Sequence, residues 1–369
     1  MEFINATRMT VGYNLGLEPS GRELLVVVIK GTFVIPKAGE KVRLCDEQLP
    51  LIMADTFTGE PGFSSPVYEV DFAPSKPACD VLLVGKALAP GGRPTTRMRV
   101  GLRVGSMEKS FDVVGDRVWN AGLATITASK PQPFIEMPVS YDTAFGGADR
   151  NSDDEKDHDA YLPNPVGRGW HKHLKSAWVD GKPLPNTEEL GKVVSFPNNK
   201  YKPMALCPLG RGWPARAQYA GTYDKEWLDD VFPFLPKDFD ERYYHAAPVD
   251  QQLPIPKGPT EVVLRGFTLD GERRFMLPHL EAPVHVFPKR GERERLLATM
   301  DTIVFEPDMG RFTMSWRVAR PLKKSLHELA QVVAGMKGRE WWQQREQVAI
   351  VAPTPIVAAP QLVPATAKA

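Results

Sequence analysis

Residues 96–104 read Thr-Arg-Met-Arg-Val-Gly-Leu-Arg-Val, so that apolar and polar side chains alternate along the stretch. Successive side chains of a β-strand point to opposite faces, and a period of two is therefore typical of a strand with one buried face. We expect an antiparallel strand whose apolar face packs on a core. Its row of arginines (Arg97, Arg99 and Arg103) is interpreted as a solvated face, with a site for an anion as the alternative.

Similar patterns occur on both sides of this stretch. Residues 23–35 contain the run Leu-Leu-Val-Val-Val-Ile and end before Pro36, which predicts a strand buried on both faces. Residues 311–318 alternate again, and their apolar side chains face one way. Shorter strands are expected at residues 80–87, 260–269, 273–277, 284–287 and 301–305.

Proline content limits the helices. The chain has 369 residues, of which 35 are proline, and a proline inside a helix removes a hydrogen-bond donor and clashes with the preceding turn. A short helix is predicted at residues 225–232, where Pro233 ends it. One stronger helix is predicted at residues 325–336, because Ser325-Leu326-His327-Glu328 is a capping box followed by apolar residues at helical spacing.

Together these patterns predict a mainly β protein. Antiparallel sheets are expected to form one or two sandwich-like β portions, joined by a long irregular middle and followed by a C-terminal α-helix. Five of the eight tryptophans lie between Trp119 and Trp227, so large rings are expected to pin the loops of the middle onto the sheets. The expected segments are an N-terminal β portion at 1–130, an aromatic-rich middle at 131–256, a second β portion at 257–322, a C-terminal helix at 323–347 and a Pro/Ala-rich tail at 348–369.

Charge and cysteine content restrict the class of protein. Lysine and arginine number 46 and aspartate and glutamate 45, whereas a nucleic-acid binder needs a basic excess to neutralise phosphates. Cys45, Cys79 and Cys207 are odd in number and widely spaced, which indicates free thiols in a reducing compartment. No secretory signal is visible at the N-terminus, and the apolar stretch 348–367 is broken by four prolines. We expect a cytoplasmic protein with no membrane insertion.

The motif search predicts no catalytic residue, no cofactor and no metal ion. The sequence has no Gly-x-Ser-x-Gly, His-Glu-x-x-His or phosphate-loop motif, and residues 210–215 have nucleotide-binding spacing but no preceding strand. The acidic run at 149–159 begins like a calcium loop but lacks the required glycine and the final glutamate. It is interpreted as a solvated loop, and His171 and His173 as surface histidines, since no third ligand is nearby.

Residues 242–252 carry the densest polar chemistry of the chain. Asp250 with His245 is one candidate acid–base pair, and the alternative is that Arg242, Asp250 and Gln251 satisfy backbone groups of a loop. A hydrolase would need paired carboxylates in a cleft, such as Asp238 or Asp240 together with Asp250. The structural interpretation is favoured, because no nucleophile or cofactor motif accompanies these residues.

A series of short motifs follows one another in the second and third quarters of the chain. They are Ser-Tyr-Asp-Thr-Ala-Phe-Gly-Gly at 140–147, Asn-Pro-Val-Gly-Arg-Gly at 164–169, Leu-Pro-Asn-Thr-Glu at 184–188, Trp-Pro-Ala-Arg at 213–216, Ala-Gly-Thr-Tyr-Asp at 220–224 with Trp227, Leu-Pro-Lys-Asp-Phe-Asp at 235–240, Asp-Gln-Gln at 250–252 and Phe-Met-Leu-Pro at 275–278. In this order, and with the opening phrase at 5–31, they resemble the bacterial domain-of-unknown-function family 2169, which is associated with type VI secretion. The resemblance covers roughly residues 1–320.

The resemblance implies a cytoplasmic adaptor or chaperone that is not an enzyme. Such proteins help to load an effector, often one with a PAAR-like domain, onto the VgrG spike. The chain departs from the family pattern at Tyr244-His245, where a Phe-Asn-like pair is expected, and it has no pentapeptide-repeat extension. The motif residues implied to bind a partner or to order loops are Tyr141, Gly146, Gly147, Asn164, Gly167, Trp213, Arg216, Tyr223, Trp227, Asp238, Arg242, Asp250 and Gln251.

Partner binding by such a protein has several candidate modes. Strand edges could add a strand of the effector, and aromatic residues could form hot spots. Candidate contact aromatics are Trp170, Trp178, Trp341 and Trp342, although each is more typical of a core or a pinned loop. The alternatives to an adaptor are a β-rich hydrolase and a carbohydrate-binding component of the cell-envelope or secretion machinery.

Overall fold

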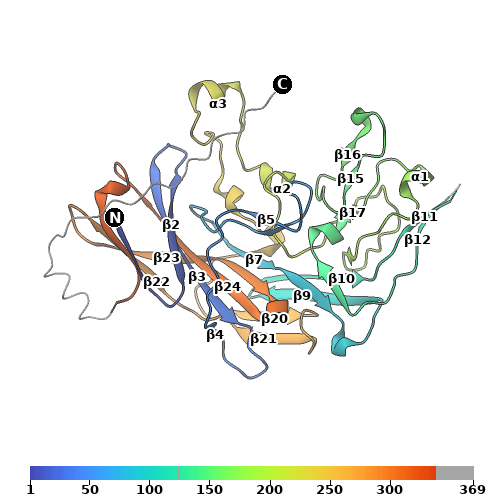
Figure 1. Ribbon diagram of the computed structural model, residues 1–369, viewed down its shortest axis with the longest axis horizontal. Coiled ribbons are helices and arrows are strands. Elements are labelled where there is room, and N and C mark those ends of the chain that lie inside the picture. Colours follow the sequence, from blue (N-terminus) through green and yellow to red (C-terminus); the bar gives the residue numbers. More distant parts are fainter. Residues whose placement is uncertain (123–124, 338–369) are drawn as a thin grey trace.

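A computed structural model of the protein describes residues 1–122 and 125–337, and its described part is mainly β (Figure 1). The largest sheet has ten strands, and its central path runs β1-β25-β22-β23-β24-β3-β2. These strands are β1 (Glu2–Ala6), β2 (Thr10–Leu17), β3 (Glu23–Val34), β22 (Ala282–Pro288), β23 (Glu294–Glu306), β24 (Arg311–Pro321) and β25 (Leu329–Gly335), and off this path lie β4 (Arg43–Leu44), β7 (Cys79–Leu83) and β19 (Gln252–Leu253).

A second sheet has five strands in the order β18-β10-β9-β20-β21. They are β18 (Thr187–Glu188), β10 (Met107–Val114), β9 (Arg97–Val104), β20 (Glu261–Arg265) and β21 (Glu272–Met276). The other strands form short pairs: β5 (Thr56–Phe57) with β6 (Pro66–Tyr68), β8 (Gly85–Leu88) with β13 (Glu136–Val139), β11 (Trp119–Ala121) with β12 (Ile126–Ala128), β14 (Phe145–Gly146) with β17 (Arg168–Gly169), and β15 (Ala148–Asp149) with β16 (Asp159–Ala160).

Helices in the described residues are short. The α-helices are α1 (Ser176–Val179), α2 (Pro214–Ala217) and α3 (Lys225–Asp230), and the 3₁₀ turns are η1 (Pro90–Gly92), η2 (Tyr141–Thr143), η3 (Glu155–Asp157), η4 (Glu241–Tyr244), η5 (Val249–Gln251), η6 (Pro307–Met309) and η7 (Leu326–Glu328). None of them, within residues 1–122 and 125–337, combines the length and apolar composition needed to cross a membrane.

In both sheets a strand from the first third of the chain pairs with one from the last third. In the large sheet β3 pairs with β24 along eleven residue pairs, and in the second sheet β9 pairs with β20. The large sheet also curls, because β1 and β2 lie at the two ends of its strand order but are joined by residues 7–9 alone. The rings of Phe3 and Tyr13 on these two strands lie 4.9 Å apart.

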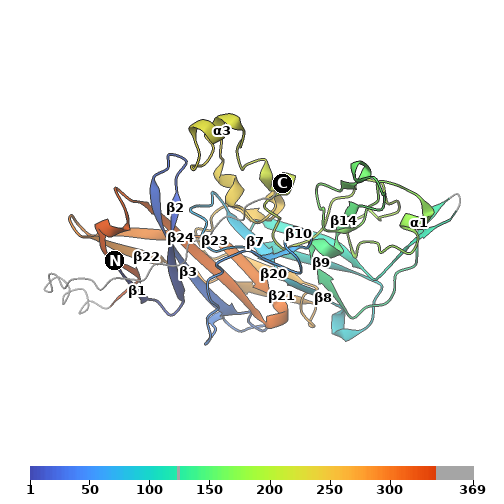
Figure 2. The same cartoon turned by 45° about the horizontal axis from the view of Figure 1, so that its top comes forward.

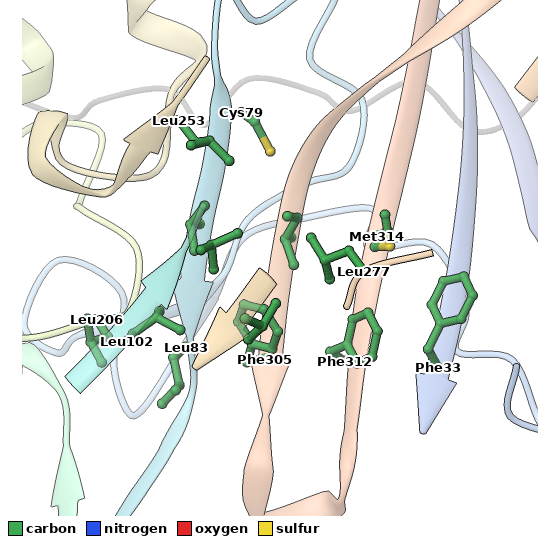
Figure 3. Packing of buried hydrophobic residues seen from close by; sticks show 14 of the residues in the cluster. Phe33, Cys79, Leu83, Leu102, Leu206, Leu253, Leu277, Phe305, Phe312 and Met314 are labelled. Carbon is green, nitrogen blue, oxygen red and sulfur yellow. The ribbon is translucent and has the colours of Figure 1, made fainter. Parts of the chain in front are cut away.

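The main hydrophobic core contains side chains from both sheets. Phe33, Phe312 and Phe305 form a row across β3, β24 and β23, with ring centroids 5.3 and 5.6 Å apart (Figure 3). Phe275 of β21, in the second sheet, packs its ring 5.5 Å from that of Phe312. Buried side chains of β9, such as Leu102, belong to the same cluster. One core therefore holds both sheets.

The strands expected from alternation are confirmed. Residues 97–104 form β9, in which Val100, Leu102 and Val104 are buried while Arg97 and Arg99 are exposed. Residues 23–34 form β3, which is buried on both faces. The predicted strands at 260–269, 273–277, 284–287, 301–305 and 311–318 correspond to β20, β21, β22, β23 and β24. That the β portions form a sandwich stays a prediction.

The helix predicted at residues 325–336 is wrong. Ser325 accepts a bond from the backbone NH of His327 as a cap should, but only the 3₁₀ turn η7 follows. Leu329–Gly335 instead forms β25, which lies between β1 and β22 and is mostly buried. Pairing on both sides overrides helical spacing, because β-branched residues such as Val332 and Val333 pack well in a central strand. The rest of the predicted helix and the tail lie outside the described residues.

The irregular middle is ordered by aromatic contacts, as expected. The ring of Phe145 packs edge-on against Tyr161 and Tyr201, at 5.1 and 4.9 Å. Trp119 is fully buried in the same cluster and donates its indole NH to the carbonyl of Gly169. The predicted helix after Thr222 is also present as α3, whose first turn is capped by Asp224.

Removal of the Phe312 ring, which contacts rings from both sheets, tests the assignment of the core. Phe312→Ala should lower the free energy of unfolding by about 3–5 kcal/mol, because it leaves a cavity among several aromatic rings. Phe63→Ala is the matched control, since Phe63 is exposed, and it should change stability by less than about 0.5 kcal/mol. Urea unfolding followed by tryptophan fluorescence measures both, and equal losses would contradict the assigned core.

Candidate functional site

The motif residues fall into two groups. Most lie at junctions that hold the irregular middle: Tyr141, Gly146, Gly147, Asn164, Gly167, Trp213, Arg216, Asp250 and Gln251. The others, which are Tyr223, Trp227, Asp238 and Arg242, belong to residues 219–242. We call residues 219–242 the projection. In both views the part around α3 extends away from the sheets (Figures 1 and 2).

Asn164 and the glycines around it form one tightly packed junction. The Asn164 amide donates to the carbonyls of Tyr141 and Phe145, at 2.8 and 3.1 Å. Gly146 has a φ of +153°, and a Cβ there would lie 2.1 Å from the carbonyl oxygen of Asn164. Only glycine fits at this position, because two backbone segments approach each other closely. The glycine of this motif is therefore required by the geometry of the loops.

Tyr141, Trp213 and Arg216 join α2 to the body of the protein. The rings of Tyr141 and Trp213 meet edge to face at 4.9 Å. Arg216 is buried, donates to the carbonyl of Tyr243 at 2.8 Å and forms an ion pair with Glu69. These contacts connect α2 with the chain that follows the projection, and so they fix its base.

Asp250 and Gln251 hold a further junction. Gln251 is fully buried and donates its amide to the carbonyls of Val81 and Leu206, at 2.9 and 3.0 Å. Lys109, which is also buried, donates to Gln251 at 2.8 Å and to Asp250 at 3.2 Å. Gln251 therefore satisfies backbone carbonyls, as the structural interpretation expected. Asp250 instead balances the charges of Lys109 and Lys202, and Arg242 donates to the carboxylate of Asp240.

The candidate acid–base pair of His245 with Asp250 does not form. The Nδ1 atom of His245 lies 2.6 Å from Asp80 Oδ1, and Asp80 also accepts from the backbone NH of Ala246 at 2.8 Å. Lys76 donates to the other oxygen of Asp80 at 2.7 Å. Burial alone would raise the pKa of Asp80, but Lys76 and His245 lower it to about 2. The carboxylate therefore stays ionised inside the protein.

Asp80 is part of a larger set of buried charges on the face of the large sheet opposite the core. Arg317 forms an ion pair with Asp301 and donates to Thr302 at 3.1 Å, and Lys76 donates to the same hydroxyl at 3.2 Å. Arg317 also donates to the carbonyl of Asp71 at 2.6 Å. We call the buried polar network the set Lys30, Asp71, Lys76, Asp80, His245, Asp301, Thr302 and Arg317.

The buried polar network joins the sheet to the chain that covers it. Lys30 of β3 donates to Asp71 at 2.9 Å, and the same Asp71 oxygen accepts from the backbone NH of Ile52 at 2.8 Å. A cavity of about 180 Å³ lies above the network. Thr313, Ser315 and Ile52 are among the residues that line it.

The carboxyl groups considered for hydrolysis are bound in other ways. Asp238 accepts from the backbone NH and the hydroxyl of Thr222, and these bonds lower its pKa. The side chain of Arg242 likewise lowers the pKa of Asp240. Burial raises the pKa of Asp250, but Lys109 and Lys202 together outweigh that effect and the net pKa is lowered. A general acid requires a raised pKa, so these groups favour a structural role.

The residues considered for ions also have protein partners. Asp149 is buried and accepts from Asn151 at 2.7 Å and from the backbone NH of His173 at 2.9 Å. In residues 1–122 and 125–337 no group of three or more His, Cys, Asp or Glu side chains could hold a metal ion. In the arginine row, Arg97 pairs with Glu188 at 2.5 Å and Arg103 with Glu261 at 2.5 Å.

The projection is ordered by its own aromatic stack. Trp227 lies at the centre, with its ring 4.8 Å from that of Tyr223 and 5.5 Å from that of Phe232. Its indole NH donates to the carbonyl of Phe234 at 2.9 Å. At the base, Arg242 lies over the ring of Tyr219. The projection is therefore a preformed surface.

The projection exposes large apolar side chains beside acidic ones. Leu228 is 58% exposed and Phe232 is 61% exposed. The segment has seven acidic residues and three basic ones, and two of the basic ones pair within it, Lys237 with Glu226 and Arg242 with Asp240. Among the other candidate aromatics, Trp170 and Trp178 are half-buried, whereas Trp341 and Trp342 lie outside the described residues.

The sequence motifs include residues of the projection but none that indicates the buried polar network. Lys30 interrupts an otherwise apolar strand, and Arg317 lies within an alternating one. A charged residue inside a predicted strand is the one local feature of the sequence that could have indicated the buried polar network. Their acidic partners come from distant segments and have no spacing that a motif search could detect.

Comparison with known proteins gives one family. A family model described as "Uncharacterized protein conserved in bacteria (DUF2169)" matches residues 20–317, which include both groups of motif residues. Among curated proteins and solved structures, none matches the chain.

Neutralising Asp80 tests the buried polar network. Asp80→Asn leaves Lys76 buried without its counter-charge and should lower the free energy of unfolding at pH 7 by about 3–5 kcal/mol. The folded pKa of Asp80, about 2, lies below its ordinary value of 3.8. The stabilisation is therefore present above about pH 4 and is lost as the pH falls through about 2.

The difference between the wild-type protein and Asp80→Asn should accordingly shrink as urea unfolding is repeated at decreasing pH. Asp153→Asn is the control, because Asp153 is exposed, and it should leave stability within about 0.5 kcal/mol. An Asp80→Asn protein as stable as the wild type at pH 7 would refute the role given to the network.

Proposed function

The chain belongs to the DUF2169 family of bacterial proteins, and from this membership we propose that it is a cytoplasmic adaptor or chaperone of type VI secretion. In this proposal it binds an effector, with a PAAR-like domain as the expected handle, and assists its loading onto the VgrG spike. It acts by binding alone, with no catalytic residue and no cofactor.

The observation that carries the proposal is the exposed, preformed surface of the projection. Leu228 and Phe232 are large exposed apolar side chains, and the ring of Phe232 packs against that of Trp227. Exposed apolar groups on a rigid support are typical of protein-binding surfaces, where aromatic residues contribute most of the affinity. A rigid surface also loses little conformational entropy on binding.

The state of the candidate catalytic carboxyls also supports binding rather than hydrolysis. Asp238 and Asp240 bond to neighbouring residues of the projection, and Asp250 bonds to lysines. All of these pKa values are lowered, and no general acid is provided among these three groups.

Affinity purification from a bacterium with active type VI secretion tests the proposal. Tagged wild-type protein should recover an effector together with its spike protein. The double variant Leu228→Ser with Phe232→Ser removes about 2–4 kcal/mol of apolar contact and should recover at least about tenfold less effector. Mass spectrometry of the eluate measures the recovery.

The control makes the same two changes elsewhere on the surface. Leu162 and Phe63 are 62% and 60% exposed, which matches the exposure of Leu228 and Phe232. Leu162→Ser with Phe63→Ser should recover the effector as the wild type does. Reproducible absence of both the effector and the spike protein from the wild-type eluate would contradict the adaptor role.

A further inference from the structure

A groove of about 190 Å³ lies beside the base of the projection. One side is the end of β2 and the turn that follows it, with Leu17 and Pro19. The other side comes from the end of the projection and η4, with Phe239 and Tyr244. Ala319 of β24, in the large sheet, also lines the groove.

The projection and the β2–β3 hairpin are in direct contact next to this groove. Gly21, in the hairpin turn, has a φ of +80°, and a Cβ there would lie 2.6 Å from the ring of Phe234. The ring of Phe234 therefore packs on the turn itself. The hairpin beside the groove therefore contacts the projection, and segments about 200 residues apart in the sequence lie side by side here.

The charges around the groove have one sign. Glu18 and Glu241 line it, and its lining among the described residues includes no lysine, arginine or histidine. Glu18 accepts from the hydroxyl of Ser20 at 3.1 Å, but neither glutamate has an ion pair in the described part of the chain. Burial, and then the charge of Glu241, raise the pKa of Tyr244 to about 12, so its phenol adds no charge to the groove.

The exposed face of the projection also carries acidic side chains beside apolar ones. Asp229 and Asp230 are exposed at the end of α3, directly after Leu228. Neither carboxylate has an ion pair within the described residues. Acidic side chains without ion pairs among the described residues therefore lie both at the groove and on α3, next to exposed apolar side chains, and Lys225 is the one basic residue of α3.

We infer that the groove and the projection bind a protein segment in which lysine or arginine side chains flank large apolar ones. The apolar groups of such a segment contact Leu17, Phe239 and the exposed face at Leu228 and Phe232, while its cations pair with Glu18 and Glu241. Charge complementarity selects this partner over an acidic or neutral segment, because like charges beside a desolvated contact are repulsive. The inference rests on the proposed function and specifies the segment of the effector that is recognised.

A peptide titration with the full-length protein tests this inference. Two short fluorescein-labelled peptides carry the same leucines and phenylalanines, and their remaining charged positions are lysine in one and glutamate in the other. Fluorescence anisotropy should show the lysine peptide binding at least about tenfold more tightly. Its affinity should fall by at least about threefold when sodium chloride rises from about 50 to about 300 mM, since screening weakens exposed charge pairs.

Two double variants assign the preference to the groove. Glu18→Lys with Glu241→Lys should abolish or reverse the preference for lysine, and Glu18→Gln with Glu241→Gln should reduce it without changing the shape of the side chains. Glu47→Lys with Glu60→Lys, which alters exposed glutamates elsewhere, is the control and should retain the preference. Matching thermal unfolding curves establish that each variant is folded.

The inference is overturned if both peptides bind the wild type equally, or if the preference survives reversal at Glu18 and Glu241. This outcome is separate from the affinity purification. A lysine preference that depends on the groove, without any effector in the eluate, contradicts the adaptor role and supports the binding chemistry. An effector in the eluate without a lysine preference supports the adaptor role and contradicts the inferred binding chemistry of the groove.

Discussion

The burial of three cations, Lys30, Lys76 and Arg317, on one face of the large sheet constrains the rest of the structure. A buried charge without a counter-charge costs several kcal/mol, so each cation must be paired and hydrogen-bonded. Their partners come both from neighbouring strands and from the chain that lies over the face, in particular Asp71 and, through Asp80, His245. The covering chain is therefore part of the folded unit, since its removal would leave ionised groups unpaired.

This constraint explains how a long irregular middle keeps a defined shape. Its backbone has few regular ladders, and side chains such as Asn164, Gln251 and Arg216 bond to the backbone groups that strands would otherwise satisfy. Aromatic clusters supply the packing. The projection begins directly after this ordered base, so a surface built from loops is positioned by the body of the protein.

The alternation of apolar and polar residues predicted strands correctly where consecutive residues point to different environments. The alternation at 97–104 and at 311–318 predicts strands, and both stretches are strands, although the polar face of the second is buried as well. The same approach failed at Leu329–Gly335, where the capping box is present but pairing with β1 and β22 decides the conformation. In the candidate site, the motif residues Tyr223 and Trp227 could be named from the sequence, but Leu17 and Glu18 could not, because only the fold brings the β2–β3 hairpin against the projection.

The sequence by itself determined the mainly β character, the positions of most strands, the irregular aromatic middle and the family. These depend on alternation, turn residues and motif order, which are properties of consecutive residues. Only the tertiary structure decided that His245 pairs with Asp80, 165 residues away, rather than with the nearby Asp250. It alone also joined Glu18 to Glu241 in one acidic groove. Electrostatic and packing energies depend on distance in space, and distance along the chain does not predict them.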